Sequence, residues 1–283
     1  MTENTFNINI KGELRDFRTP WVMGIVNVTP DSFYSGSRTP DCDSIKARIE
    51  SMRRSGAQAL DIGGYSSRPG AEDVCADEEY NRVALALQCV AAEWPEAVVS
   101  VDTFRASVAR RCVEEWGVDI INDISGGDMD PDMFETVAQT GAAYILMHMR
   151  GTPATMQGLC SYDDVTAEVM TDLANKAARL QQLGVKDIIL DPGFGFAKTV
   201  EQNYELMAHL RDIKLMGYPL LVGVSRKSMI YKPLGISPAD SLPGTTTLNT
   251  FALLNGADIL RVHDVAEAVQ TVKVARMLLD VDV

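Results

Sequence analysis

VVSVD (98–102), followed by FRASVARRCVEEWG (104–117), is the stretch of sequence that decides the fold. The first run is short, mostly apolar and not alternating, which is typical of a strand buried on both faces in a parallel sheet. It ends in a carboxylate, Asp102. The second run has the periodicity of a helix and ends in Gly117, as helices often do at their C-caps. One buried strand followed by one helix is the repeating unit of an α/β fold.

Eight such apolar runs occur along the chain, and helical patterns separate them. The runs are VMGIVN (22–27), ALDIGG (59–64), VVSVD (98–102), IINDIS (120–125), YILMH (144–148), IILDP (188–192), LLVGVSRK (220–227) and ILRVHD (259–264). Eight strand–helix units predict a (β/α)8 TIM barrel. Residues 5–18 alternate around Lys11 and Gly12, which predicts a short N-terminal β-hairpin. The helical pattern after the sixth run covers residues 200–217. No linker interrupts the pattern, so residues 1–283 are expected to form a single domain.

Composition excludes several classes of partner. The chain has 26 Lys and Arg against 39 Asp and Glu, a formal net charge of −13, which argues against nucleic-acid and anionic-membrane partners. The five cysteines are scattered without a CxxC pair, so we expect free thiols and neither a disulfide framework nor a zinc site. Neither a secretory signal pattern nor a run of about 18 apolar residues occurs, and we therefore expect a cytoplasmic protein.

Each apolar run ends in a polar or charged residue, and in a barrel these C-terminal strand ends meet at one mouth. The expected acceptors there are Asp61, Asp102, Asn122, Asp123 and Asp191, and the expected donors are Lys227, Arg261 and His263. A lone aspartate at a strand end often caps the next helix, but convergence of so many favours a binding site. His148 stays open between a ligand-binding role and a hydrogen bond to the next loop. His209 lies within a helical pattern and is set aside.

Such a mouth suits a polar heterocycle with an anionic tail. A fixed carboxylate can accept two adjacent N–H groups of a 2-amino-4-oxo pyrimidine edge. Arg261 and His263 are two apart on one strand and share a face, so together with Asn27 they can hold a phosphate. Because the chain has no HxH, HExxH or cysteine cluster, we expect Mg²⁺ to arrive with a diphosphate, through an oxygen ligand such as Asn27.

Eight ordered motifs carry a family resemblance. They are MGIVNVTPDSF (23–33), DIGG (61–64) with SSRPGA (66–71), SVDT (100–103), NDISGG (122–127), MHMRGTPATMQ (147–157), DPGFGFAK (191–198), GVSRKSMI (223–230) and RVHDV (261–265). With these motifs the chain resembles the dihydropteroate synthase family from Trp21 to Leu279. The resemblance implies a transferase that condenses 6-hydroxymethyl-7,8-dihydropterin diphosphate with p-aminobenzoate to give 7,8-dihydropteroate and diphosphate. It also implies Mg²⁺ as cofactor and a homodimer.

The resemblance assigns site residues motif by motif. It implies that the pterin is bound by Asp102, Asn122, Met147, Asp191, Phe196, Gly223, Lys227 and Arg261. It implies that p-aminobenzoate and the two catalytic loops, residues 29–41 and 65–74, involve Phe33, Ser67, Arg68, Pro69 and Ser228, beside Phe196 and Lys227. It implies that diphosphate is held by Asn27, Ser67, Arg68, Arg261 and His263, with Asn27 also on the metal. The catalytic residues implied are Lys227, Arg261, His263, Asp31 and Arg68, for a reaction in which diphosphate leaves before the amine attacks.

Three positions depart from the family pattern. Tyr65 stands where the family often has an acidic residue, Ser67 stands in place of a threonine, and Ser35 in place of an aspartate. Two other readings remain open. One is a methyltetrahydrofolate methyltransferase, which shares the pterin slot but needs a corrinoid and no diphosphate grip. The other is a paralogue that binds pterins without condensing them.

Overall fold

The computed structural model describes residues 6–29, 42–66 and 74–281. Eight parallel strands form its central sheet, in the order β8-β7-β6-β5-β4-β3-β10-β9. They are β3 (Trp21–Asn27), β4 (Ala59–Gly63), β5 (Val98–Asp102), β6 (Ile120–Asp123), β7 (Ala143–Met147), β8 (Ile188–Asp191), β9 (Leu221–Val222) and β10 (Ile259–Val262). A parallel bridge between Leu190 and Leu220 joins the two ends of the sheet. The predicted (β/α)8 barrel is therefore confirmed.

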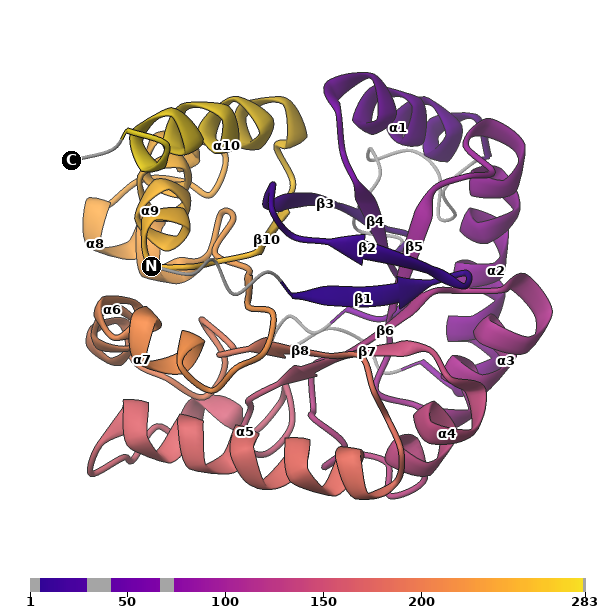
Figure 1. The fold of residues 1–283 in the computed structure, drawn as a ribbon, viewed down its shortest axis with the longest axis horizontal. Helices are drawn as coiled ribbons and strands as arrows, with labels where there is room; N and C mark the ends of the chain where they lie inside the picture. The colour runs from indigo at the N-terminus through magenta and orange to yellow at the C-terminus, as the bar shows by residue number, and fades with distance from the viewer. Residues whose placement is uncertain (1–5, 30–41, 67–73, 282–283) are drawn as a thin grey trace.

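Helices surround this barrel (Figure 1). They are α1 (Cys42–Ser55), α2 (Ala76–Glu93), α3 (Ala106–Trp116), α4 (Met133–Thr140), α5 (Val165–Gln182), α6 (Val200–Ala208), α7 (Leu210–Lys214), α8 (Ser228–Leu234), α9 (Leu242–Leu254) and α10 (Val265–Leu279), with a 3₁₀ turn at Met156–Gly158. The single helix predicted over 200–217 is wrong, because the backbone leaves the helical conformation at His209 and divides it into α6 and α7. The seven-residue α8 was not predicted, since so short a segment shows no clear period.

The predicted hairpin is present as β1 (Asn7–Ile10) paired with β2 (Glu13–Asp16). Its turn residues Lys11 and Gly12 have φ values of 53° and 84°, the left-handed pair that a two-residue hairpin turn requires. Ile8 and Ile10 are buried in a cluster that includes Trp21 at the start of β3. The hairpin thus closes the N-terminal end of the barrel, opposite the strand ends that carry the polar residues.

The strand residues alternate between two apolar layers, one inside the barrel and one between the strands and the helices. Alternate residues such as Ala59, Ile120 and Ile259 fill the barrel interior, while Leu60 and Ile121 pack outward against the helices. The same alternation continues to the strand ends. Residues two positions after an interior residue therefore point into the mouth. They are Asn27, Asp61, Asp102, Asn122, Met147, Asp191, Gly223 and Arg261.

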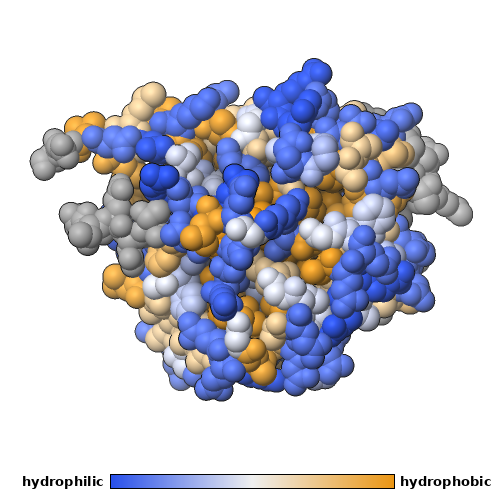
Figure 2. Space-filling model, turned by 45° about the vertical axis from the view of Figure 1, so that its right-hand side comes forward, coloured by the Kyte–Doolittle hydropathy of each residue, from blue (hydrophilic) through white to orange (hydrophobic). Residues whose placement is uncertain are grey.

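The outer surface is mixed in character. Figure 2 shows hydrophobic atoms mainly between protruding hydrophilic side chains on the face that it draws. Among the helices of the described residues, none combines the length and apolar composition that a membrane crossing requires.

Candidate active site

The mouth of the barrel is built around a partly buried arginine that bridges two carboxylates. Arg261 Nε donates to Asp61 Oδ2 at 2.6 Å, and its terminal nitrogen donates to Asp102 Oδ2 at 2.7 Å. Asn122 Nδ2 donates to the same Asp61 oxygen at 3.0 Å. Register explains the convergence, since Asp102 on β5 pairs directly with Asn122 on β6. Four strands, β4, β5, β6 and β10, therefore present one continuous polar network.

Burial dominates the electrostatics of this network. It raises the pKa of Asp102 to about 7, although the nearby Arg261 charge acts in the opposite direction. Burial alone would lower the pKa of Arg261, but the charges of Asp61 and Asp102 outweigh it and raise that pKa. Arg261 therefore stays charged, while Asp102 changes protonation near neutral pH. Asp61 is fully buried, and within the described residues its Oδ1 accepts no hydrogen bond.

Two further charged residues, Lys227 and Asp191, lie beside this network and interact with each other electrostatically. Lys227 Nζ donates to the carbonyl oxygen of Phe194 at 2.5 Å and lies 4.7 Å from the centroid of the Phe196 ring. Asp191 Oδ1 accepts from the backbone N–H of Gly193 at 2.8 Å. Burial lowers the pKa of Lys227 to about 8, against the opposing charge of Asp191, and burial raises the pKa of Asp191.

Four other expected residues flank these charges. Met147 is buried in a small cluster with Phe196 next to it. Gly223 lies beside Arg261, and a Cβ at this position would lie 3.8 Å from the Cβ of Arg261. As a glycine it leaves this side of Arg261 uncovered. Ser228 begins α8 directly after Lys227. Five assigned residues, Asp31, Phe33, Ser67, Arg68 and Pro69, lie outside the described residues, as does Ser35.

His263 and Asn27 lie at the ends of the neighbouring strands β10 and β3, whose pairing is parallel. The Nδ1 of His263 lies 3.0 Å from Ser225 Oγ. Burial, and next the Arg261 charge, lower the pKa of His263 to about 4, so its ring is neutral at pH 7. Asn27 is partly exposed, and its Oδ1 faces the open side of Gly63, where a Cβ would lie 3.3 Å away.

Asp123 and His148 do not take part in the mouth. Asp123 was expected there as an acceptor, which is wrong: it points outward and accepts from Tyr144 Oη at 2.7 Å and from the Ser125 and Gly127 backbone N–H groups at 2.8 Å each. Strand alternation is the reason, since its neighbour Asn122 takes the inward direction. His148 is buried beside Lys198, and burial followed by that charge lowers its pKa to about 2.

Two residues received no individual role in the sequence assignments. Asp61 was expected as an acceptor at the mouth, and it accepts from both Arg261 and Asn122. Lys198 was not considered, although it closes the DPGFGFAK motif and is only 4% exposed. Its position in a glycine-rich motif directly after a strand was the available signal.

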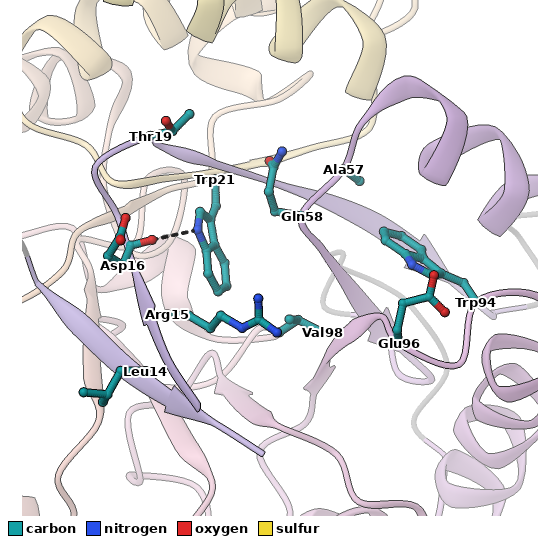
Figure 3. A pocket seen from close by; sticks show the side chains of 10 residues that line it. All are labelled: Leu14, Arg15, Asp16, Thr19, Trp21, Ala57, Gln58, Trp94, Glu96 and Val98. Atoms are coloured by element: carbon teal, nitrogen blue, oxygen red, sulfur yellow. Dashed lines mark hydrogen bonds between the residues drawn. The ribbon is translucent and has the colours of Figure 1, made fainter. Parts of the chain in front are cut away.

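A cavity of about 600 Å³ lies at the other end of the barrel, between the hairpin and the start of the strands. Figure 3 shows Trp21 and Trp94 on its walls. Several of its polar groups bind neighbouring groups of the wall: Trp21 Nε1 donates to Asp16 O at 3.1 Å, and the Gln58 side chain accepts from the Val22 N–H and donates to the Gly56 carbonyl. The charged cluster of the strand ends, and not this cavity, has the chemistry of a catalytic site.

Comparison with known proteins places this geometry in a family. Residues 23–263 match the pterin binding enzyme family. The dihydropteroate synthase of Escherichia coli (strain K12) is 41% identical over 271 residues, 95% of each chain, and that of Synechocystis sp. is 43% identical over 261 residues, 91% of this chain and 90% of that one.

Two solved structures are similar to this chain as well. The dihydropteroate synthase of Yersinia pestis, in a sulfonamide drug complex, has a TM-score of 0.91 at 36% identity, and covers 98% of this chain and 100% of its own. The Xanthomonas albilineans enzyme with 4-aminobenzoic acid has a TM-score of 0.90 at 35% identity with the same coverage. The full-length similarity, the barrel and its charged mouth agree, and the chain belongs to the dihydropteroate synthases, transferases of the pterin-binding enzyme family.

Proposed function

We propose that this chain, as one pterin-binding domain over residues 1–283, condenses 6-hydroxymethyl-7,8-dihydropterin diphosphate with p-aminobenzoate. The products are 7,8-dihydropteroate and diphosphate. The observation that carries the proposal is the partly buried network of Arg261 with Asp61 and Asp102, next to the charges of Lys227 and Asp191. These residues place acceptors for the N–H groups of a heterocycle and cations for an anionic tail together in the mouth of the barrel, at the C-terminal ends of the strands.

Pterin recognition is assigned to the acceptors that point inward. Asp191 and Asp102 accept the paired N–H groups of the pyrimidine edge, and Asn122 offers one donor and one acceptor to the neighbouring ring atoms. Lys227 donates to the pterin, while Phe196, Met147 and Gly223 bound the slot. Burial has raised the pKa of both carboxyl groups, which means that it disfavours their ionised forms. Hydrogen bonds donated by a ligand stabilise the ionised carboxylates and so offset this effect of burial.

Departure of the diphosphate is assigned to Arg261 and His263, with Ser67 and Arg68. The bond between the pterin methylene and the diphosphate oxygen breaks first, and the electron pair leaves with the diphosphate. The methylene cation is delocalised into the dihydropterin ring and is attacked by the aromatic amine, whose nitrogen then loses a proton to water or to the departed diphosphate. Arg261 stabilises the leaving charge from a fixed position, which is the largest contribution that a preorganised site makes. The negative charge of a bound diphosphate also raises the pKa of His263, so the imidazole ring becomes more protonated when the substrate is bound.

Mg²⁺ fits this arrangement as an ion brought by its ligand. Among the described residues no group of three or more His, Cys, Asp or Glu side chains is placed to hold a metal. The Asn27 amide oxygen, open on the side of Gly63, offers a single oxygen ligand. Mg²⁺ usually takes one or two protein oxygens together with phosphate oxygens and water. When bound, it would neutralise charge on the diphosphate.

The p-aminobenzoate site is assigned to Phe196, Lys227 and Ser228, completed by Phe33 and Pro69. The Phe196 ring and the Lys227 ammonium are already adjacent, so an aromatic carboxylate finds a stacking surface and a cation together. Asp31 is assigned to the positive charge that develops as the amine attacks.

Two further features of the chain belong to the proposal. A homodimer would bury the apolar side chains that α9 and α10 expose, since Phe251 is 41% and Met277 70% exposed, with Val274 and Leu278 beside the latter. A cytoplasmic location agrees with five free cysteines.

A single-turnover assay for diphosphate release tests the reaction. The expected result is release that requires p-aminobenzoate together with the pterin diphosphate and Mg²⁺. Diphosphate release that p-aminobenzoate does not accelerate, without formation of 7,8-dihydropteroate, would refute the condensation, as would no release at all from correctly folded protein. Methyl transfer to a corrinoid would instead support the methyltransferase, and pterin binding without release would support a binding paralogue.

A further inference from the structure

The segment after β8, DPGFGFAK (191–198), has a backbone that needs internal support. Gly193, Gly195 and Ala197 all have left-handed φ values, of 71°, 82° and 48°. Such a conformation is costly for alanine, which has a Cβ. The segment also lies very close to β7, because a Cβ at Gly193 would be 2.0 Å from the carbonyl oxygen of His148. So tight a turn holds its shape only where other groups fix it.

Lys198 supplies that support from inside the protein. Its Nζ lies 3.0 Å from the Gly193 carbonyl oxygen, 3.1 Å from the Phe196 carbonyl oxygen and 3.0 Å from His148 Nδ1. An ammonium group has three donors, and here all three have an acceptor. The side chain thus closes the turn on itself and ties it to the end of β7.

The same turn holds the two charged residues assigned to the pterin. The Gly193 N–H donates to Asp191, and the Phe194 carbonyl accepts from Lys227. No hydrogen bond of the described residues joins Lys198 directly to Asp191 or Lys227. The hydrogen bonds of Lys198 therefore reach the ligand only through the turn, while its charge also acts directly on Asp191 and Lys227.

We propose that Lys198 is a positioning residue of the reaction, which fixes the 193–196 turn so that Lys227 and Asp191 face the pterin. This inference rests on the proposed function. Burial lowers the pKa of Lys198 to about 7, so enclosing this side chain carries a desolvation cost. Its hydrogen bonds to two carbonyl groups of the turn offset that cost.

The test is a double-mutant cycle between Lys198→Met and Lys227→Met, read by calorimetric binding of an oxidised pterin such as 6-hydroxymethylpterin. If Lys198 acts through Lys227, Lys198→Met weakens binding by about tenfold in the wild-type background and by less than about twofold in the Lys227→Met background. Equal losses in both backgrounds, or wild-type affinity in Lys198→Met, would overturn the proposal. Should Lys198→Met fail to fold, Lys198→Gln, which keeps a two-donor head group, serves in the same cycle.

Turnover provides a readout that general destabilisation does not move. Lys198→Met is expected to raise the KM for the pterin diphosphate by about tenfold with less than about threefold change in kcat, whereas a partly unfolded enzyme loses kcat at unchanged KM. Lys214→Met is the control, because Lys214 is a partly buried lysine paired with Asp258 at the N-terminal end of the barrel, and the KM of this variant should equal that of the wild type. If the wild type itself neither binds the pterin nor turns over, the proposed function fails and the positioning role falls with it.

Discussion

Removal of the bridging guanidinium should leave two carboxylates facing one another without a cation. Arg261→Met keeps an apolar stem but deletes the donors to Asp61, whose side chain is fully buried, and to Asp102, whose side chain is 20% exposed. Breaking a buried pair by deleting one partner costs about 3–5 kcal/mol. At about 2–4 °C per kcal/mol for a chain of this size, the melting temperature should fall by about 10 °C.

The loss should depend on pH, with a sign set by Asp102. Its folded-state pKa of about 7 is already raised above the ordinary value, so the folded protein binds its proton more tightly than the unfolded chain. Stability from such a group is greatest at low pH and is lost as pH rises through the folded pKa. Without Arg261 that pKa rises further, and the destabilisation by Arg261→Met should therefore be larger at pH 8 than at pH 5.5.

A second substitution distinguishes the effect of the unpaired carboxylate charges from the effect of lost packing around residue 261. Adding Asp61→Asn to Arg261→Met removes one of the two facing charges, and the double variant should regain about half of the lost stability or more. It should not regain turnover, because the cation for the diphosphate is still missing. Arg276→Met, at an exposed pair with Asp280, is the control and should cost less than about 1 kcal/mol. Thermal melts at the two pH values would refute the reasoning if the loss were independent of pH, or if the double variant melted below the single one.

Three further outcomes are expected. Lys227→Ala should lower condensation by about tenfold or more at an unchanged fold, because a buried charge-assisted hydrogen bond is lost; wild-type turnover would remove Lys227 from the site. Pterin binding between about pH 5 and 7 should release a proton from Asp102, so its calorimetric heat should vary with the ionisation enthalpy of the buffer, and Asp102→Asn should abolish that dependence. Cys42 Sγ and Cys89 Sγ lie 2.7 Å apart, only about 0.7 Å more than a disulfide bond, so oxidised glutathione should link them by thiol–disulfide exchange. Titration of free thiols should then show a loss of two, absent in Cys42→Ser; a full thiol count in the oxidised wild type would contradict this.

The strand pattern predicts which polar residues lie near the site. Whether each of their side chains points into the barrel or away from it depends on which strand residues fill the barrel interior. Asn122 and Asp123 are adjacent and equally polar, yet one enters the mouth and the other binds Tyr144 on the outside. Counting back by twos to Ile120, which fills the barrel interior, separates them. Once the interior layer is known, the two-residue period of a strand decides which of the polar terminators are functional.

The sequence by itself determined the barrel, the hairpin and the family, because each rests on local patterns: apolar runs, helical periods, a Lys-Gly turn and short motifs. Only the tertiary structure decided the partners. Arg261 and Asp61 are 200 residues apart, and Lys198 and His148 are 50 apart. Their contacts exist because the parallel strands close on one another and bring all the strand ends to one mouth. No local pattern encodes such a distance, and the pKa values that follow from burial in that mouth were equally invisible before the chain was folded.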